Sequence, residues 1–234
     1  MVLMNKLPDD VFSIVLPYLD DSHYQFSLTC RKFNKVFNDY VIPTNNQIIN
    51  TFRYKSEITQ LKLIENKKCD MSTNIDEILL YSINRVTLNV MERLLKNPKI
   101  DPSINNNKII VLAAEYRRYD IIYLLLNDSR VDPSAQNNAV FCCAARDDNC
   151  YLIDLLLKDK RINPADQNNL AIQWAAYNGN IRIIKRLLKD PRVDPTDEDN
   201  YCIRIASHIG YYDVVKLLLS DKRVDPSINN AATK

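Results

Sequence analysis

The sequence predicts an all-α protein in which a short N-terminal helical module precedes a solenoid of stacked helix pairs. Three observations carry this prediction: prolines recur every 31 residues, apolar residues recur at helical spacing within each 31-residue segment, and the first 43 residues lack the period. The periodic prolines are Pro102, Pro133, Pro164, Pro195 and Pro226. A unit of this length cannot bury two apolar helix faces alone, so its neighbours must stack on it.

The period also sets the predicted domain organisation. Five repeats span residues 70–100, 101–131, 132–162, 163–193 and 194–224, and the first of them has Met71 where the others have proline. Residues 225–234 form the stub of a further repeat. Residues 1–43 form the separate module. Residues 44–69 are predicted to be a helical bridge or a degenerate half-repeat, because Ile58, Leu61 and Ile64 have helical spacing.

Each repeat is predicted to hold two helices. A leucine pair recurs in the second helix, preceded three and four residues earlier by branched apolar residues, which makes one apolar face. The pairs begin at Leu94, Leu125, Leu156, Leu187 and Leu218. A small residue in the first helix lets neighbouring helices approach closely; this column is Ser82, Ala113, Ala144, Ala175 and Ala206.

Two turns in each repeat need unusual backbone angles. The corner between the helices falls at Arg117, Asp148, Gly179 and Gly210, where we expect a left-handed residue. The turn before the first helix reads "NNN", "QNN", "QNN" and "EDN" in successive repeats. Asparagine tolerates a positive φ better than other non-glycine residues, so it is expected to replace glycine there.

The segment "AIQWAAYNGNIRIIKRLLKDPRVDP" at 171–195 resembles the ankyrin repeat. The resemblance covers roughly residues 70–234, although the period is 31 rather than 33 and the TPLH tetrapeptide of the family is replaced. It implies a protein-binding surface formed by residues that vary between repeats. These are Glu115, Tyr116, Arg146, Asp147, Tyr177, Asn178, His208 and Ile209, bordered by the turn tips at 104–105, 135–136, 166–167 and 197–198.

The N-terminal segment 7–40 has helical features of its own. Pro8 suits a first helical turn beside Asp9 and Asp10, and Val11, Val15 and Leu19 follow at a spacing of four. The segment resembles an F-box, with a Leu-Pro start, an acidic pair and a Cys-Arg close. Pro17 inside the first helix and Phe33 in place of tryptophan are departures from that pattern.

The F-box resemblance implies docking on the Skp-type adaptor of a cullin ubiquitin ligase. The residues at the matching adaptor-binding positions are Leu7, Pro8, Val15, Leu16 and Leu19. The chain is then a substrate receptor that holds an unknown target protein on its repeats. The alternative is an ankyrin scaffold or inhibitor, whose N-terminal helices only cap the solenoid. The short repeats are similar to those of giant DNA viruses of amoebae, which would make either protein a host-interaction factor.

Composition argues against several other functions. The formal charge of +2 gives no support for nucleic-acid binding, and no apolar run is long enough for a membrane span. Two histidines and six cysteines without a CxxC pair do not suit a catalytic triad or a metal site, so we expect no enzyme, no metal and no cofactor. Without a secretory signal, the protein is expected in the cytoplasm, or in the host cytoplasm if it is viral.

Two further expectations concern the loops and the C-terminal end. Each loop places an aspartate two residues before an arginine, as in Asp190 and Arg192. This spacing predicts a ladder of alternating charge between stacked loops, or else a site for phosphate or an acidic partner. Because no polar capping repeat closes the array, fraying or pairing with another chain is expected near residues 212–234.

Overall fold

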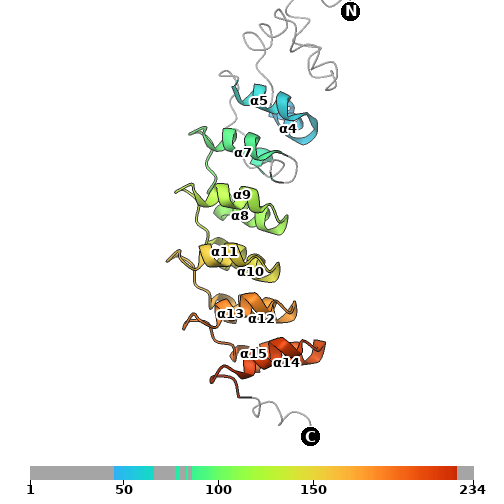
Figure 1. Ribbon diagram of the computed structural model, residues 1–234. Helices are drawn as coiled ribbons and strands as arrows, with labels where there is room; N and C mark the ends of the chain where they lie inside the picture. The colour runs from blue at the N-terminus through green and yellow to red at the C-terminus, as the bar shows by residue number, and fades with distance from the viewer. Residues whose placement is uncertain (1–44, 66–76, 80–82, 84–85, 226–234) are drawn as a thin grey trace, which may run out of the picture. The chain divides into compact units, whose positions relative to one another are not determined.

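The computed structural model describes residues 45–65, 77–79, 83 and 86–225, and every regular element among them is a helix (Figure 1). The chain divides into two compact units, Met1–Asn105 and Asn106–Lys234. The predicted F-box-like module, Ser82 and the stub beyond Asp225 lie outside the described residues. No helix in the described part is long and apolar enough to cross a membrane.

Unit 1 contains α4 (Asn45–Tyr54), α5 (Glu57–Glu65) and α7 (Leu88–Leu95), and α5 packs against both other helices. The predicted helical bridge is therefore a helix pair. On α5, Ile58 is 46% exposed, while Gln60 and Leu63 are buried. The Gln60 amide donates hydrogen bonds to the carbonyls of Phe52 (3.4 Å) and Lys55 (3.1 Å), so burial of this amide satisfies the end of α4 and fixes the rotation of α5.

Unit 2 consists of helix pairs that repeat with the period of the sequence. The helices are α8 (Ile104–Glu115), α9 (Tyr119–Leu126), α10 (Ala135–Arg146), α11 (Cys150–Leu156), α12 (Asp166–Tyr177), α13 (Ile181–Leu187), α14 (Asp197–Ile209) and α15 (Tyr212–Leu219). The first helices α10, α12 and α14 pack in series, and the second helices α11, α13 and α15 do the same. The predicted solenoid of helix pairs is confirmed for these residues.

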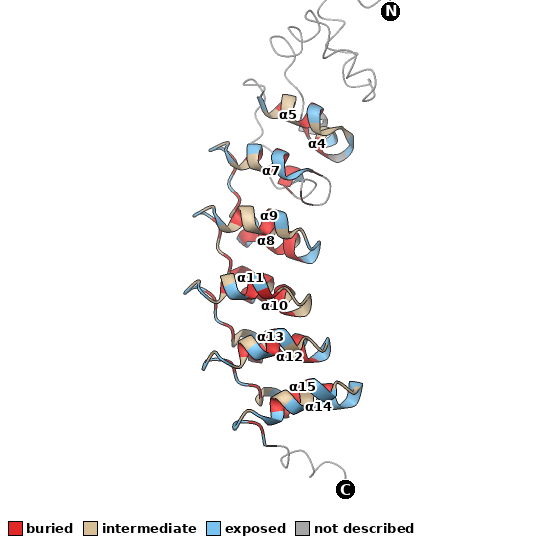
Figure 2. Cartoon of the chain, viewed as in Figure 1, coloured by how far each residue is buried: buried red, intermediate tan, exposed pale blue. Residues whose placement is uncertain are grey.

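The core of unit 2 follows the predicted columns (Figure 2). Most of the branched positions and the first leucine of each pair are buried, as at Ile121, Ile122 and Leu125. The second leucines are less buried than predicted: most are half-buried, and Leu219 is 46% exposed. The small-residue column is fully buried at Ala113, Ala144, Ala175 and Ala206. A larger side chain in that column would push neighbouring helices apart, since cores packed at this density have no room for it.

The two predicted turns are confirmed. Arg117, Asp148, Gly179 and Gly210 all have positive φ. Three consecutive left-handed residues follow the first residue of each first helix, so the predicted turn lies just inside the bounds given above. The last asparagine of the turn is buried at Asn107, Asn138, Asn169 and Asn200. Asn169 accepts a hydrogen bond from the Asp194 amide (2.7 Å) and donates one to the Asp197 carboxylate (2.8 Å), so it ties its repeat to the next one.

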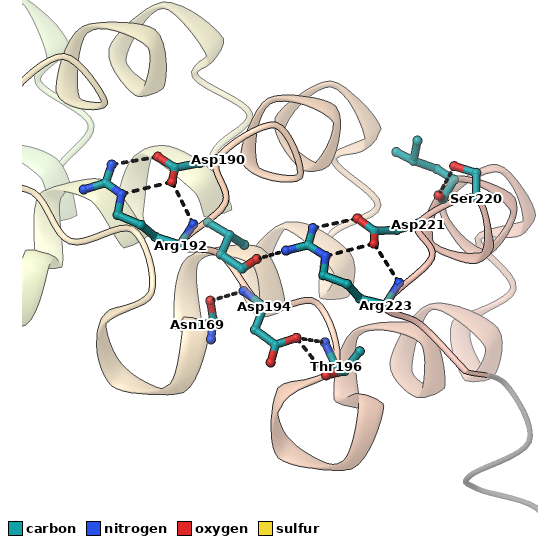
Figure 3. A network of polar contacts seen from close by, with 10 residues as sticks. Asn169, Asp190, Arg192, Asp194, Thr196, Ser220, Asp221 and Arg223 are labelled. Carbon is teal, nitrogen blue, oxygen red and sulfur yellow. Dashed lines mark hydrogen bonds and ion pairs between the residues drawn. The ribbon is translucent and has the colours of Figure 1, made fainter.

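The loops between repeats are linked differently from the predicted charge ladder (Figure 3). Arg192 pairs with Asp190 of its own loop (2.7 Å), and its other terminal nitrogen donates to the Ile162 carbonyl of the preceding repeat (3.1 Å). Arg161 contacts the Val131 carbonyl (3.0 Å) in the same way, and Arg223 contacts that of Val193. The ladder between loops therefore joins guanidinium groups to carbonyls rather than aspartates to arginines.

The aspartates of these loops are consequently part of the fold. The hydrogen bond from Arg192 outweighs the effect of burial and lowers the pKa of Asp190. In the other loops, the arginine two residues later lowers the pKa of Asp128, Asp159 and Asp221 in the same way. Because both partners of each pair are engaged, the loops do not offer the free arginine side chains that a phosphate site would use. The predicted fraying of residues 212–234 stays a prediction, although α15 packs on both α13 and α14.

Candidate protein-binding surface

The predicted target-binding residues lie at the carboxyl ends of the first helices. Glu115, Arg146 and Tyr177 are the last residues of α8, α10 and α12, and Ile209 is the last residue of α14. Glu115, Arg146 and Tyr177 occupy one position of the 31-residue period, and Ile209 occupies the next position, in register with Tyr116. We call the exposed members of this set, together with Trp174, the first-helix surface: Glu115, Tyr116, Trp174, Tyr177, Asn178, His208 and Ile209.

Trp174 is a functional candidate that sequence reasoning missed. It is 38% exposed, and its indole ring meets the 47%-exposed Tyr177 edge-on, with the ring centroids 5.9 Å apart. Asn178 donates a hydrogen bond to the Trp174 carbonyl (2.9 Å), which fixes the end of α12. The available signal was the three-residue spacing between Trp174, the sole tryptophan, and Tyr177, because residues three apart share one side of a helix.

Asp147 differs from the rest of the predicted set because its side chain is only 3% exposed. Its carboxylate accepts hydrogen bonds from Tyr119 (2.9 Å), Arg117 (3.0 Å) and Arg146 (3.0 Å). Tyr119 and Arg117 belong to the preceding repeat. Asp147 therefore joins two repeats, and Arg146 is half-buried beside it.

The Asp147 cluster shifts the pKa of its members. Burial raises the pKa of Asp147, but hydrogen bonds from Arg146 and Tyr119 and the nearby positive charges outweigh it, so the pKa lies below its usual value. Burial, the hydrogen bond to Asp147 and its negative charge raise the pKa of Tyr119 to about 12. Asp147 is thus held ionised and Tyr119 neutral at pH 7, as a structural hydrogen-bond cluster requires.

The end of α10 is fixed from the following repeat as well. The Asn180 side-chain amide donates hydrogen bonds to the carbonyls of Ala145 (2.8 Å) and Arg146 (2.9 Å). These carbonyls have no partner within their own helix end, so the amide supplies one. The end of α10 is therefore held by contacts from both neighbouring repeats.

The cysteines of unit 2 have the chemistry of core residues. Burial raises the pKa of Cys142 and Cys202 to about 12, and burial also raises the pKa of Cys143 and Cys150. A thiol with so high a pKa is not a nucleophile at pH 7. Among the described residues, no group of three histidine, cysteine or acidic side chains could hold a metal ion.

Comparison with protein-family models identifies the C-terminal helix pairs. Residues 141–230 match the family model described as ankyrin repeats (3 copies). This segment is an ankyrin-repeat array. No curated protein and no solved structure gives a match to the chain.

The ankyrin match contains Trp174, Tyr177, His208 and Ile209, and so covers the exposed aromatic pair of α12. The helix pair of α8 and α9 precedes the matched segment but has the same left-handed turn and the same buried columns. Segment 7–40 also lies outside the match, and its F-box resemblance stays a prediction.

Proposed function

We propose that this chain is a non-enzymatic adapter whose ankyrin repeats hold a target protein on the first-helix surface. Ankyrin repeats are protein–protein interaction modules, and one observation supports the assignment of the surface. Trp174 and Tyr177 leave much of an aromatic pair exposed on α12, which packs between α10 and α14. Tryptophan and tyrosine are enriched among the residues that dominate binding energy at protein interfaces.

The surroundings of the aromatic pair also suit a protein partner. Tyr116 and Ile209 add exposed apolar area at the equivalent ends of α8 and α14. Glu115 and His208 are exposed near them and can give the polar contacts found at an interface rim. The rigid cluster around Asp147 supports the middle of the surface, which lowers the entropy lost when a partner binds.

We further propose that segment 7–40 docks on a Skp-type adaptor, which makes the chain a substrate receptor of a cullin-type ubiquitin ligase. The support is the ordered F-box resemblance at Leu7, Pro8, Val15, Leu16 and Leu19. In this role the protein performs no chemistry itself. It brings the target into reach of the ligase, which is proximity catalysis supplied by the complex.

The adaptor proposal is tested by calorimetry of the full chain with a purified Skp-type adaptor. Wild-type protein should bind, and a Leu7→Ala, Pro8→Ala double variant with unchanged helicity should lose the binding heat. Absence of binding by the folded wild type would refute the ligase role and leave an ankyrin scaffold or inhibitor.

The target surface is tested by placing a photo-crosslinking residue at Tyr177 and, as a control, at Tyr212 on a second helix. A partner protein that crosslinks only from position 177 is then purified, and its affinity for the chain is measured by titration. The Trp174→Ala variant should weaken its affinity by about tenfold or more, as expected for a central aromatic contact. Equal loss of affinity in Tyr212→Ala would show that the first-helix surface is not the binding site.

A further inference from the structure

A basic groove lies between the second helices α11 and α13, away from the first-helix surface. It encloses about 780 Å³ and is lined by both helices and the loops that follow them. Its lysines are Lys158, Lys185 and Lys189, all of them exposed. Lys158 and Lys189 occupy the same position in consecutive repeats, just beyond the carboxyl ends of α11 and α13, where the helix dipole favours a positive charge.

The charges of this groove do not balance. Its two carboxylates are already paired: Asp154 with Arg186 (2.8 Å) and Asp190 with Arg192 (2.7 Å). Within the described residues, none of the three lysines has an ion pair. Three ammonium groups in one groove repel each other in the free protein, and an anionic partner would relieve this repulsion.

A second groove, on the other side of α11, is aromatic. Tyr123 of α9 and Tyr151 of α11 meet edge-on there, with the ring centroids 5.3 Å apart, and Leu126 and Leu155 complete an apolar lining. The space measures about 380 Å³, and Tyr151 is 68% exposed. A ligand that crosses α11 thus meets aromatic rings on one side and lysines on the other.

We propose that the outer face of α11 binds an acidic peptide segment in which apolar or aromatic side chains adjoin the carboxylates. Carboxylates lie against the lysine groove, and an apolar side chain enters the tyrosine groove. A nucleic acid fits less well, because its phosphates follow one another without interruption, whereas the lysines line only one of the two grooves. The formal charge of +2 for the whole chain also gives little long-range attraction for a polyanion.

The proposal is tested on the full chain by fluorescence anisotropy with three labelled probes. They are the peptide Glu-Glu-Leu-Phe-Glu-Glu, a hexaglutamate, and a twelve-residue oligo-dT. The mixed peptide should bind most tightly, and its affinity should fall as salt is added. Tighter binding of oligo-dT, or no binding of the mixed peptide, would overturn the proposal.

Charge reversal assigns the grooves. The Lys158→Glu, Lys189→Glu variant should weaken binding of the mixed peptide by about tenfold, because single lysine contacts at a solvated surface are weak but the reversal replaces attraction by repulsion at two positions. Lys216→Glu, an equally exposed change on α15, should have no such effect. Tyr151→Ala should weaken the mixed peptide but leave hexaglutamate binding unchanged. If the Lys158→Glu, Lys189→Glu variant still bound the mixed peptide, the proposed site on α11 would be wrong. The Trp174→Ala variant should bind the mixed peptide normally, which separates the site on α11 from the first-helix surface.

Discussion

Substitution of Asp147 by asparagine removes a negative charge that is bound by side chains of two consecutive repeats. The carboxylate is 3% exposed and accepts hydrogen bonds from Tyr119, Arg117 and Arg146. Arg117 is 66% exposed, so solvent screens its contribution almost entirely. The cost therefore depends mainly on the hydrogen bonds from Tyr119 and the half-buried Arg146. Loss of the charge that accepts these two bonds should lower the unfolding free energy by about 2 kcal/mol.

The effect should depend on pH with a defined sign. The folded-state pKa of Asp147 is depressed, so its stabilisation is complete above the unfolded value of about 3.9 and is lost as the pH falls through the lower folded value. The stability gap between wild type and Asp147→Asn should therefore be full at pH 7 and shrink below about pH 4.

Urea unfolding followed by circular dichroism from pH 7 to pH 3 measures both quantities. The exposed carboxylate of Asp213 supplies the control, since Asp213→Asn removes the same charge without disturbing a buried cluster. If Asp147→Asn unfolded at the same urea concentration as Asp213→Asn at pH 7, or if the gap did not change with pH, the assigned role of the cluster would be wrong.

Three other variants test the links between repeats. Arg192→Ala should lower the unfolding free energy by about 1 kcal/mol through loss of the bond to the Ile162 carbonyl, and Arg192→Lys should not restore it in urea titrations, because lysine lacks the planar fork. Asn169→Ala should cost about 2 kcal/mol by the same assay, and a neutral result would contradict its bridging role. Gly179→Ala should lower the thermal midpoint, because φ is +72° and the new Cβ would lie 3.1 Å from the Tyr211 ring; an unchanged midpoint would show that this corner relaxes freely.

The helix pairs could be predicted because each column repeats the same physical requirement. The buried alanines and the left-handed corner recur every 31 residues, so even Arg117 could be assigned a positive φ from the glycines aligned with it. Asp147 could not be assigned this way. Its column holds Tyr116, Asn178 and Ile209 in the other repeats, and its burial depends on contacts made with the preceding repeat.

Local hydrogen bonds explain the other departures from prediction. Spacing placed Asp190 and Arg192 in a ladder between loops, but the Arg192 amide and side chain both bind Asp190, so the pair closes within one loop. On α5, spacing predicted the helix but not that Gln60 would be buried, where it satisfies carbonyls at the end of α4. In both cases a polar side chain binds nearby backbone, which hydrophobic periodicity does not record.

The arginine-to-carbonyl contacts run in one direction along the chain. A later repeat always provides the guanidinium, and an earlier repeat always provides the carbonyl. A tandem duplication of residues 132–162 or 163–193 would thus carry one donor and one acceptor into the array, and the new junction would be complete at once. Such a chain can lengthen or shorten during evolution without inventing a new interface, while the exposed residues of each copy are free to diverge.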